Sequence, residues 1–178
     1  IHLLEMSPEP EQAMDSADRL GQLARDAGHI HHMPGHIYVL CGEYKRAKAA
    51  SEKAIAADKK YLEYAGPYNY YTTSRCHNLH LMMYACMHLA QFEAALLAAE
   101  EICKNLTPDI IKLKNKPFIM HTMEGYFSMK MHVLIRFGKW QEIINAAMPD
   151  NAELYCVSTS MHHYAKTVAY AATKQFIE

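Results

Sequence analysis

Apolar residues recur along most of the chain at the three- and four-residue spacing of amphipathic helices. The spacing is clearest in two alanine-rich stretches, YKRAKAASEKAIAADKKYL at 44–62 and FEAALLAAEEICKNL at 92–106. No stretch shows the convincing alternation of apolar and polar residues that indicates a strand. The pattern therefore predicts an all-α chain in which short breaks separate the helices.

Three of these breaks align as a repeat. Each has an aromatic residue two positions after a turn anchor and an alanine or isoleucine five positions after it: Gly42 with Tyr44 and Ala47, Ala90 with Phe92 and Ala95, and Gly138 with Trp140 and Ile143. The anchors are 48 positions apart both times (90 − 42 and 138 − 90), and a weaker copy has Pro8 as its anchor. Each unit is predicted to be a helix, a tight turn, an aromatic plug, and a second helix whose small residues allow close packing.

This unit resembles the tetratricopeptide repeat, whose length is about 34 residues. The best copy covers residues 28–61, with Gly35 and Tyr38 in its first helix and Ala47 and Ala54 in its second. The stretches SPEPEQAMDSADRL and HMPGHIYVLCGEY also resemble a group of mainly bacterial tetratricopeptide proteins with an HMPxHIY signature. The resemblance implies a right-handed α-solenoid of antiparallel helix pairs, whose first helices line a concave groove that binds a peptide or protein partner.

We expect a single helical-repeat domain over residues 1–178, with units at about 1–27 (partial), 28–75, 76–123, 124–159 and 160–178 (partial). A spacing of 48 residues exceeds the repeat length by about 14 (48 − 34). We place the extra residues in YLEYAGPYNYYTTSR (61–75) and LTPDIIKLKNKP (106–117). The chain opens with Ile1 and ends in a helical pattern, which favours a fragment of a longer array.

Composition narrows the classes of partner. A net charge of −1 over 178 residues gives no basic field for nucleic acid. No apolar run approaches the roughly 18 residues of a membrane span. The five cysteines are an odd number and form no C-x-x-C pair, so neither a disulfide framework nor a cysteine zinc site is expected. A reducing compartment, the cytoplasm, fits this cysteine usage better.

The placement of the twelve histidines is independent of the glycines, aromatics and alanines that define the repeat. Groove-facing positions of a first helix are expected 13, 10, 6 and 2 residues before the turn anchor, since these steps keep to one helical face. The positions hold His29, His32, His36 and Leu40 before Gly42; His77, His80, Tyr84 and His88 before Ala90; Gly125, Ser128, His132 and Arg136 before Gly138; and His2 before Pro8. Eight of the twelve histidines fall there, against roughly 1.4 for random placement in a 34-residue unit. A histidine-lined groove is therefore predicted.

The pairs His29/His32 and His77/His80 are i, i+3 neighbours, so each pair places two imidazoles on one helical face. First helices of adjacent units pack about 8–10 Å apart, which predicts a four-nitrogen site for a transition metal such as zinc, copper or iron. The other predicted groove residues are His2, His36, Tyr84, His88, His132 and Arg136. Two alternatives stay open: histidines that only pack and hydrogen-bond, or a groove that binds an acidic peptide or small anion.

Four histidines fall outside the groove positions and are expected to pack or to support the groove: His31, His121, His162 and His163. Pro34 leaves two arrangements open, a kink inside a helix or a helix that begins at Pro34. In the second arrangement, the segment from His29 to His32 would be a lead-in and would lose its i, i+3 geometry.

Acid–base candidates are few. Glu5 lies three residues before Pro8 and Glu124 lies beside Gly125, and both are weak catalytic candidates. No nucleophile elbow, P-loop or dinucleotide-binding glycine motif occurs. The leading hypothesis is a helical-repeat scaffold whose groove binds a peptide or protein and holds a metal among its histidines. The alternative is a metal-dependent enzyme that uses the same histidines as ligands and keeps one coordination position open.

Overall fold

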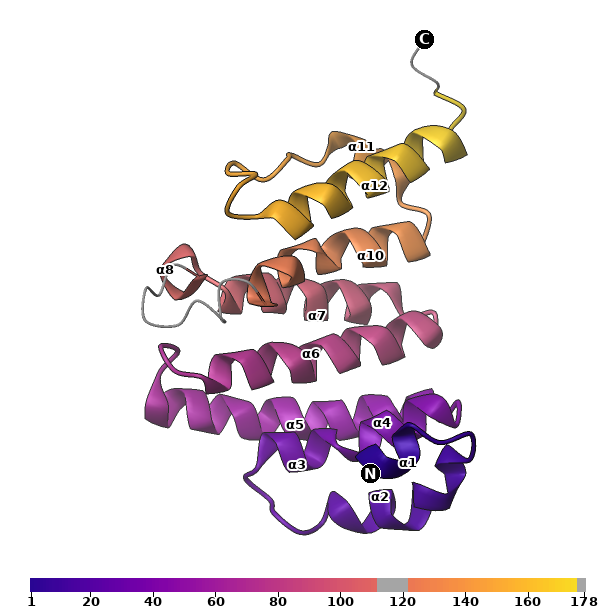
Figure 1. Ribbon diagram of the computed structural model, residues 1–178, viewed down its shortest axis with the longest axis vertical. Coiled ribbons are helices and arrows are strands. Elements are labelled where there is room, and N and C mark those ends of the chain that lie inside the picture. The colour runs from indigo at the N-terminus through magenta and orange to yellow at the C-terminus, as the bar shows by residue number, and fades with distance from the viewer. Residues whose placement is uncertain (112–121, 176–178) are drawn as a thin grey trace. The chain divides into compact units, whose positions relative to one another are not determined.

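The computed structural model describes residues 1–111 and 122–175, and within them the chain is helical with no β-strand (Figure 1), which confirms the all-α prediction. The elements are α1 His2–Glu5, the 3₁₀-helix η1 Pro10–Ala13, α2 Met14–Leu20, α3 Gly28–His32, α4 Pro34–Leu40, α5 Tyr44–Ala65, α6 Tyr71–His88, α7 Phe92–Asn105, α8 Pro108–Ile111, the 3₁₀-helix η2 Glu124–Ser128, α10 Met129–Arg136, α11 Trp140–Asn145 and α12 Cys156–Ala172. None of these helices is both long enough and apolar enough to cross a membrane.

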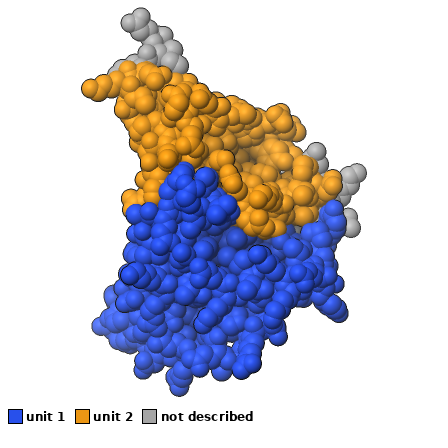
Figure 2. Space-filling model, turned by 180° about the vertical axis from the view of Figure 1, so that it is seen from behind, with its two compact units in different colours: residues 1–98 blue, residues 99–178 orange. Residues whose placement is uncertain are grey.

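The chain divides into two compact units, residues 1–98 and 99–178 (Figure 2). In the first unit, α5 packs against α3, α4 and α6, and α2 packs against α4. In the second unit, α12 packs against η2, α10 and α11. The boundary falls inside α7, so α3 and α6, which carry most of the groove histidines, belong to one unit.

The three predicted turn anchors share one backbone conformation. Gly42, Ala90 and Gly138 have positive φ angles of 76°, 56° and 65°. After each anchor the next amide donates a hydrogen bond to the carbonyl five residues earlier: Glu43 to Tyr38 (2.7 Å), Gln91 to Cys86 (2.9 Å) and Lys139 to Leu134 (2.9 Å). These are Schellman-type helix ends, and the next helix begins at Tyr44, Phe92 and Trp140 in turn. The three turns therefore have the same local structure.

A fourth turn of this kind, which the sequence pattern does not predict, ends α12. Lys174 has a φ of 57°, and the amide of Gln175 donates to the carbonyl of Tyr170 (2.9 Å). Lysine is not a characteristic turn residue, which is why the pattern missed it. Pro8, by contrast, was predicted as a turn anchor but does not form this turn, because proline fixes φ at about −65°. It lies in an irregular segment between α1 and η1.

The residues predicted as an insertion at 61–75 mostly lengthen two helices. α5 continues to Ala65 and α6 begins at Tyr71, which leaves five residues, 66–70, between them. The helices reach 22 and 18 residues in this way. The second predicted insertion, 106–117, includes α8, and its residues 112–117 lie outside the described residues.

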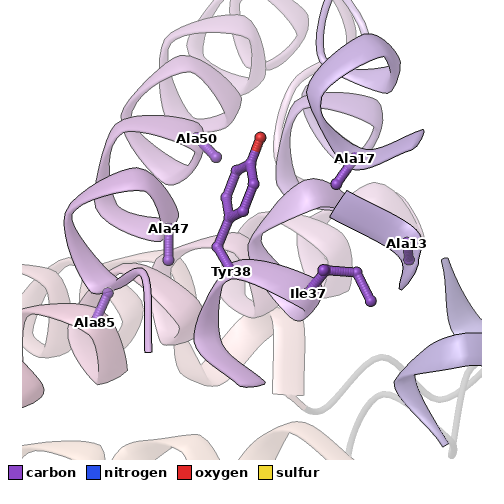
Figure 3. Packing of buried hydrophobic residues seen from close by; sticks show 7 residues of the cluster. All are labelled: Ala13, Ala17, Ile37, Tyr38, Ala47, Ala50 and Ala85. Carbon is purple, nitrogen blue, oxygen red and sulfur yellow. The ribbon is translucent and has the colours of Figure 1, made fainter. Parts of the chain in front are cut away.

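Small residues let α4 pack closely against its neighbours. The ring of Tyr38 lies between Ala17 of α2 and Ala50 of α5, and all three residues are buried (Figure 3). Toward α6, a Cβ atom at Gly35 would collide with the side chain of Leu81. These contacts fix the position of α4, and of α3 just before it, relative to α5 and α6.

Candidate metal centre

Pro34 separates two short helices that are almost continuous. α4 begins at Pro34, and α3 forms the helical turn before it. Between them, Met33 keeps an α-helical conformation (φ −51°, ψ −41°), and its amide donates to the carbonyl of His29 (3.0 Å). Proline occupies the first position of α4, and its missing N–H leaves the carbonyl of Ile30 without the usual helical donor. The helix begins at Pro34, yet His29 and His32 keep their i, i+3 geometry and do not form the irregular lead-in considered above.

Three of the four predicted metal ligands come together. His29 and His32 from α3 and His77 from α6 each place a ring nitrogen within 4.8 Å of the other two. The ring centroid of His32 lies 4.3 Å from that of His77 and 5.4 Å from that of His29. His32 is fully buried, His77 is half-buried and His29 is exposed. One side of the group is therefore accessible from solvent.

The surroundings keep two of these imidazoles neutral. Burial, reinforced by the neighbouring imidazoles, lowers the pKa of His32 far below its usual value. The same causes lower the pKa of His77 to about 4. Neutral imidazole is the form that binds a metal, so at pH 7 neither residue has to lose a proton first. The Nδ1 atom of His32 is buried without a hydrogen-bond partner, which is a costly arrangement for a polar atom.

A second set of contacts leads from His32 toward the start of the chain. The Nε2 atom of His36 lies 2.9 Å from Nε2 of His32, and its Nδ1 atom lies 2.8 Å from Oε1 of Glu5. The other carboxylate oxygen of Glu5 lies 2.7 Å from Nδ1 of His2. Partial burial raises the pKa of Glu5, but its contacts with His2 and His36 outweigh this effect and lower the pKa overall. Glu5 thus contacts two of the predicted groove histidines.

A buried hydrogen-bond network behind His29 is absent from the sequence prediction. The Tyr71 hydroxyl donates to Oδ1 of Asp58 (2.8 Å) and accepts a hydrogen bond from the backbone N–H of His29. The Asn78 amide donates to Oδ2 of Asp58 (2.8 Å). The network ties α3 to α5 and α6 and so positions the histidines of α3. Its one signal in the sequence is that Asp58 falls on the buried stripe of α5, whose other members are alanines and a serine.

His80, the fourth predicted ligand, is not a member of the close group. It lies one turn after His77 on α6. Between ring centroids, His77 lies 6.0 Å from His29 and 4.3 Å from His32, and the following helix α4 brings His36 to 5.8 Å from His77. The close group therefore contains three of the four predicted ligands, with His36 beside it.

Other predicted groove residues are not members of the close group. The ring of His88 stacks on that of Tyr44 at 4.4 Å and lies 4.6 Å from that of Tyr84. His132 and Arg136 lie on α10, in the second unit. Aromatic packing therefore accounts for the position of His88 without a ligand.

Glu124, the second acid–base candidate, caps a helix. Its buried carboxylate accepts hydrogen bonds from the amides of Val157 (2.8 Å) and Ser158 (3.2 Å) in the first turn of α12. The Ser158 hydroxyl donates in return to the carbonyl of Glu124 (2.6 Å). A carboxylate at a helix N-terminus is stabilising, and this contact explains the burial of Glu124 without a catalytic role.

The histidines outside the groove positions have other surroundings. His31 is buried, and its Nε2 atom lies 2.9 Å from a backbone carbonyl oxygen. His162 is buried too, with its Nδ1 atom 2.7 Å from the carbonyl oxygen one turn earlier, whereas His163 is exposed. His121 lies outside the described residues.

No protein-family model, curated protein or solved structure matches this chain. The tetratricopeptide resemblance and the function therefore depend on the residues of the chain itself.

Proposed function

We propose that this chain is a helical-repeat protein that binds a transition metal ion through His29, His32 and His77. The observation that carries the proposal is the meeting of three imidazole nitrogens within 4.8 Å of one another. The most buried of the three rings, that of His32, has an Nδ1 atom without a hydrogen-bond partner. A bound cation would satisfy such an atom, and the neutral rings of His32 and His77 are ready to coordinate it.

Zinc suits this donor set well. Nitrogens about 2.0–2.1 Å from a tetrahedral zinc ion are about 3.3–3.4 Å apart. The three nitrogens, which lie within 4.8 Å of one another, need to approach by at most about 1.5 Å. Imidazole also suits copper and iron.

The scaffold that we propose is a tetratricopeptide-type solenoid. Support comes from the left-handed turn shared by Gly42, Ala90 and Gly138. The residues five positions after these anchors, Ala47, Ala95 and Ile143, are all fully buried. In such arrays the concave groove binds a peptide or protein, and α3 and α6 are the helices expected to line it. We therefore propose a peptide or protein partner that binds beside the metal.

A metal-dependent enzyme is the second candidate. Three protein nitrogens leave one position of a tetrahedral ion open, as in catalytic zinc sites, whereas structural zinc sites use four protein ligands. His29 is exposed, so water or a substrate can reach the group. A metal held there would polarise a bound water or carbonyl, which is the chemistry of metal-assisted hydrolysis.

Metal analysis of protein purified without an affinity tag tests the proposal. We expect about one equivalent of zinc, copper or iron per folded chain, and its loss in His77→Ala. A folded wild-type chain that takes up no stoichiometric metal contradicts both candidates. Metal-dependent hydrolysis of a model ester, lost in His77→Ala, would favour the enzyme; metal-dependent capture of a peptide without hydrolysis would favour the scaffold.

A further inference from the structure

A chain of close contacts connects the start of the protein with the buried ring of His32. Oε1 of Glu5 contacts Nδ1 of His36 (2.8 Å), and Nε2 of His36 contacts Nε2 of His32 (2.9 Å). The three residues come from α1, α4 and α3. Both ring nitrogens of His36 are therefore engaged, and His32 has one engaged nitrogen and one buried nitrogen without a hydrogen-bond partner.

The chemistry of the groups sets the direction of these hydrogen bonds. An ionised carboxylate only accepts, so Nδ1 of His36 must carry the proton that faces Glu5. With an ordinary pKa of about 6.5, an imidazole is predominantly neutral at pH 7. Each neutral ring carries one N–H. Nε2 of His36 is therefore an acceptor and takes its hydrogen bond from Nε2–H of His32.

The proton on Nε2 leaves Nδ1 of His32 with a lone pair. This is the atom that is buried without a hydrogen-bond partner. A lone pair in that position needs a donor or a cation, and the donor atoms of His29 and His77 gather beside the same ring.

We propose that Glu5 and His36 are positioning residues that select Nδ1 of His32 as its metal-binding atom. The inference rests on the proposed metal-binding function and adds the hydrogen-bond chain that prepares the ligand. A histidine ligand usually donates its other N–H to a carboxylate, carbonyl or water, which fixes the tautomer and raises the basicity of the ligand. Here the carboxylate of Glu5 does not contact His32 directly and acts on it through the ring of His36.

The tautomers of the metal-free protein provide the first test. Long-range ¹H–¹⁵N correlation spectra of histidine-labelled protein, assigned with His32→Gln and His36→Gln, report which nitrogen of each ring carries the proton. We expect His32 to be protonated on Nε2 and His36 on Nδ1. A metal-free His32 protonated on Nδ1 would overturn the inference, whether or not the wild-type protein binds a metal.

Zinc affinity provides the second test, with Glu5→Gln, Glu5→Asp and the exposed control Glu11→Gln compared at pH 7. A glutamine amide can donate as well as accept, so it no longer fixes the direction of the chain, and we expect zinc affinity to fall about 10–100-fold, the usual effect of losing an outer partner. Aspartate keeps the acceptor and should recover most of the affinity, and Glu11→Gln should match the wild type. Wild-type protein that binds no zinc, copper or iron would refute the proposed function. Zinc binding that is the same in Glu5→Gln and wild type would refute only the role of Glu5 and His36.

Discussion

The rings of His32 and His77 lie 4.3 Å apart between centroids, although the two residues are 45 positions apart in the chain (77 − 32) and belong to different helices. The approach follows from the packing of α3 against α6 and α5, and from the hydroxyl of Tyr71, which links the backbone of His29 to the carboxylate of Asp58. The metal centre that we propose is therefore largely preformed, which lowers the ordering cost of binding.

Substitutions on α6 can distinguish a metal site of three histidines from the site of four histidines that the sequence predicts. His77→Ala removes a direct ligand, so we expect zinc affinity to fall by more than the roughly 100-fold upper range for outer partners. His80→Ala removes a residue outside the close group, so we expect a change below about 10-fold. Competition with a chromophoric chelator measures both affinities. Equal losses of zinc affinity in the two variants would indicate that His80 is a ligand as well, as the sequence predicts.

The stability of the metal-free protein should fall as the pH is lowered from about 6.5. Burial lowers the pKa of His32, His36 and His77, in the last case from 6.5 to about 4. Well above pH 6.5 these rings are neutral in both the folded and the unfolded chain, so they leave the free energy of unfolding unchanged. Below pH 6.5 the unfolded chain takes up protons that the folded chain excludes, and the free energy of unfolding decreases. For His77 this decrease ends near pH 4.

Urea unfolding at steps between pH 7.5 and pH 4.5, in the presence of a chelator, measures this dependence. His77→Gln removes one of the three groups and should flatten the curve. His163→Gln, which alters an exposed histidine on α12, should leave its slope unchanged. A slope that is the same in His77→Gln and wild type would show that His77 is not held neutral by the fold.

The features that could be predicted from the sequence are local. A turn anchor followed by an aromatic residue marks a helix end through a few neighbouring residues, and this was enough to locate the turns at Gly42, Ala90 and Gly138. The pairing of His29 with His32 follows from helical periodicity alone. Periodicity also shows which residues of α6 share a face, and so offers both His77 and His80 as ligands.

The choice between those two residues depends on tertiary geometry. Two contacts contribute to it: α3 packs against α6, and α4 approaches α6 closely at Gly35, where a Cβ would collide with Leu81. No local pattern specifies either distance. The buried carboxylate of Asp58 was missed for the same reason, because its partners Tyr71 and Asn78 lie 13 and 20 residues away.

Gly28→Ala should disturb the proposed metal centre by displacing the Asp58 hydrogen-bond network that positions α3. A Cβ at this position would collide with the carboxylate of Asp58 and come within 2.9 Å of the Tyr71 hydroxyl. Because Asp58 is buried and accepts two hydrogen bonds, displacing it should cost about 1–3 kcal/mol of unfolding free energy and should weaken zinc binding. Urea unfolding and zinc titration measure the two effects.

Gly21→Ala is the matched control for this substitution. A Cβ at Gly21 would make only an ordinary contact with the side chain of Pro34 at 3.7 Å. We expect zinc affinity to remain at the wild-type value in this variant. If Gly28→Ala bound zinc as tightly as Gly21→Ala, the Asp58 network would have no role in positioning α3.

The left-handed turn at Ala90 can be tested by making it resemble its two counterparts. Ala90 has a φ of 56°, where Gly42 and Gly138 have glycine. A left-handed conformation costs an L-residue roughly 1–2 kcal/mol, and glycine avoids this cost but loses about 0.5–1 kcal/mol of chain entropy on folding. Ala90→Gly should therefore raise the free energy of unfolding by about 0.5–1 kcal/mol.

Gly42→Ala should lower the free energy of unfolding by a similar amount through backbone conformation alone, because a Cβ at Gly42 meets nothing within 4 Å. Thermal unfolding measures both variants, with Ala94→Gly inside α7 as a control that should be destabilised, and a loss of stability in Ala90→Gly would contradict the left-handed turn.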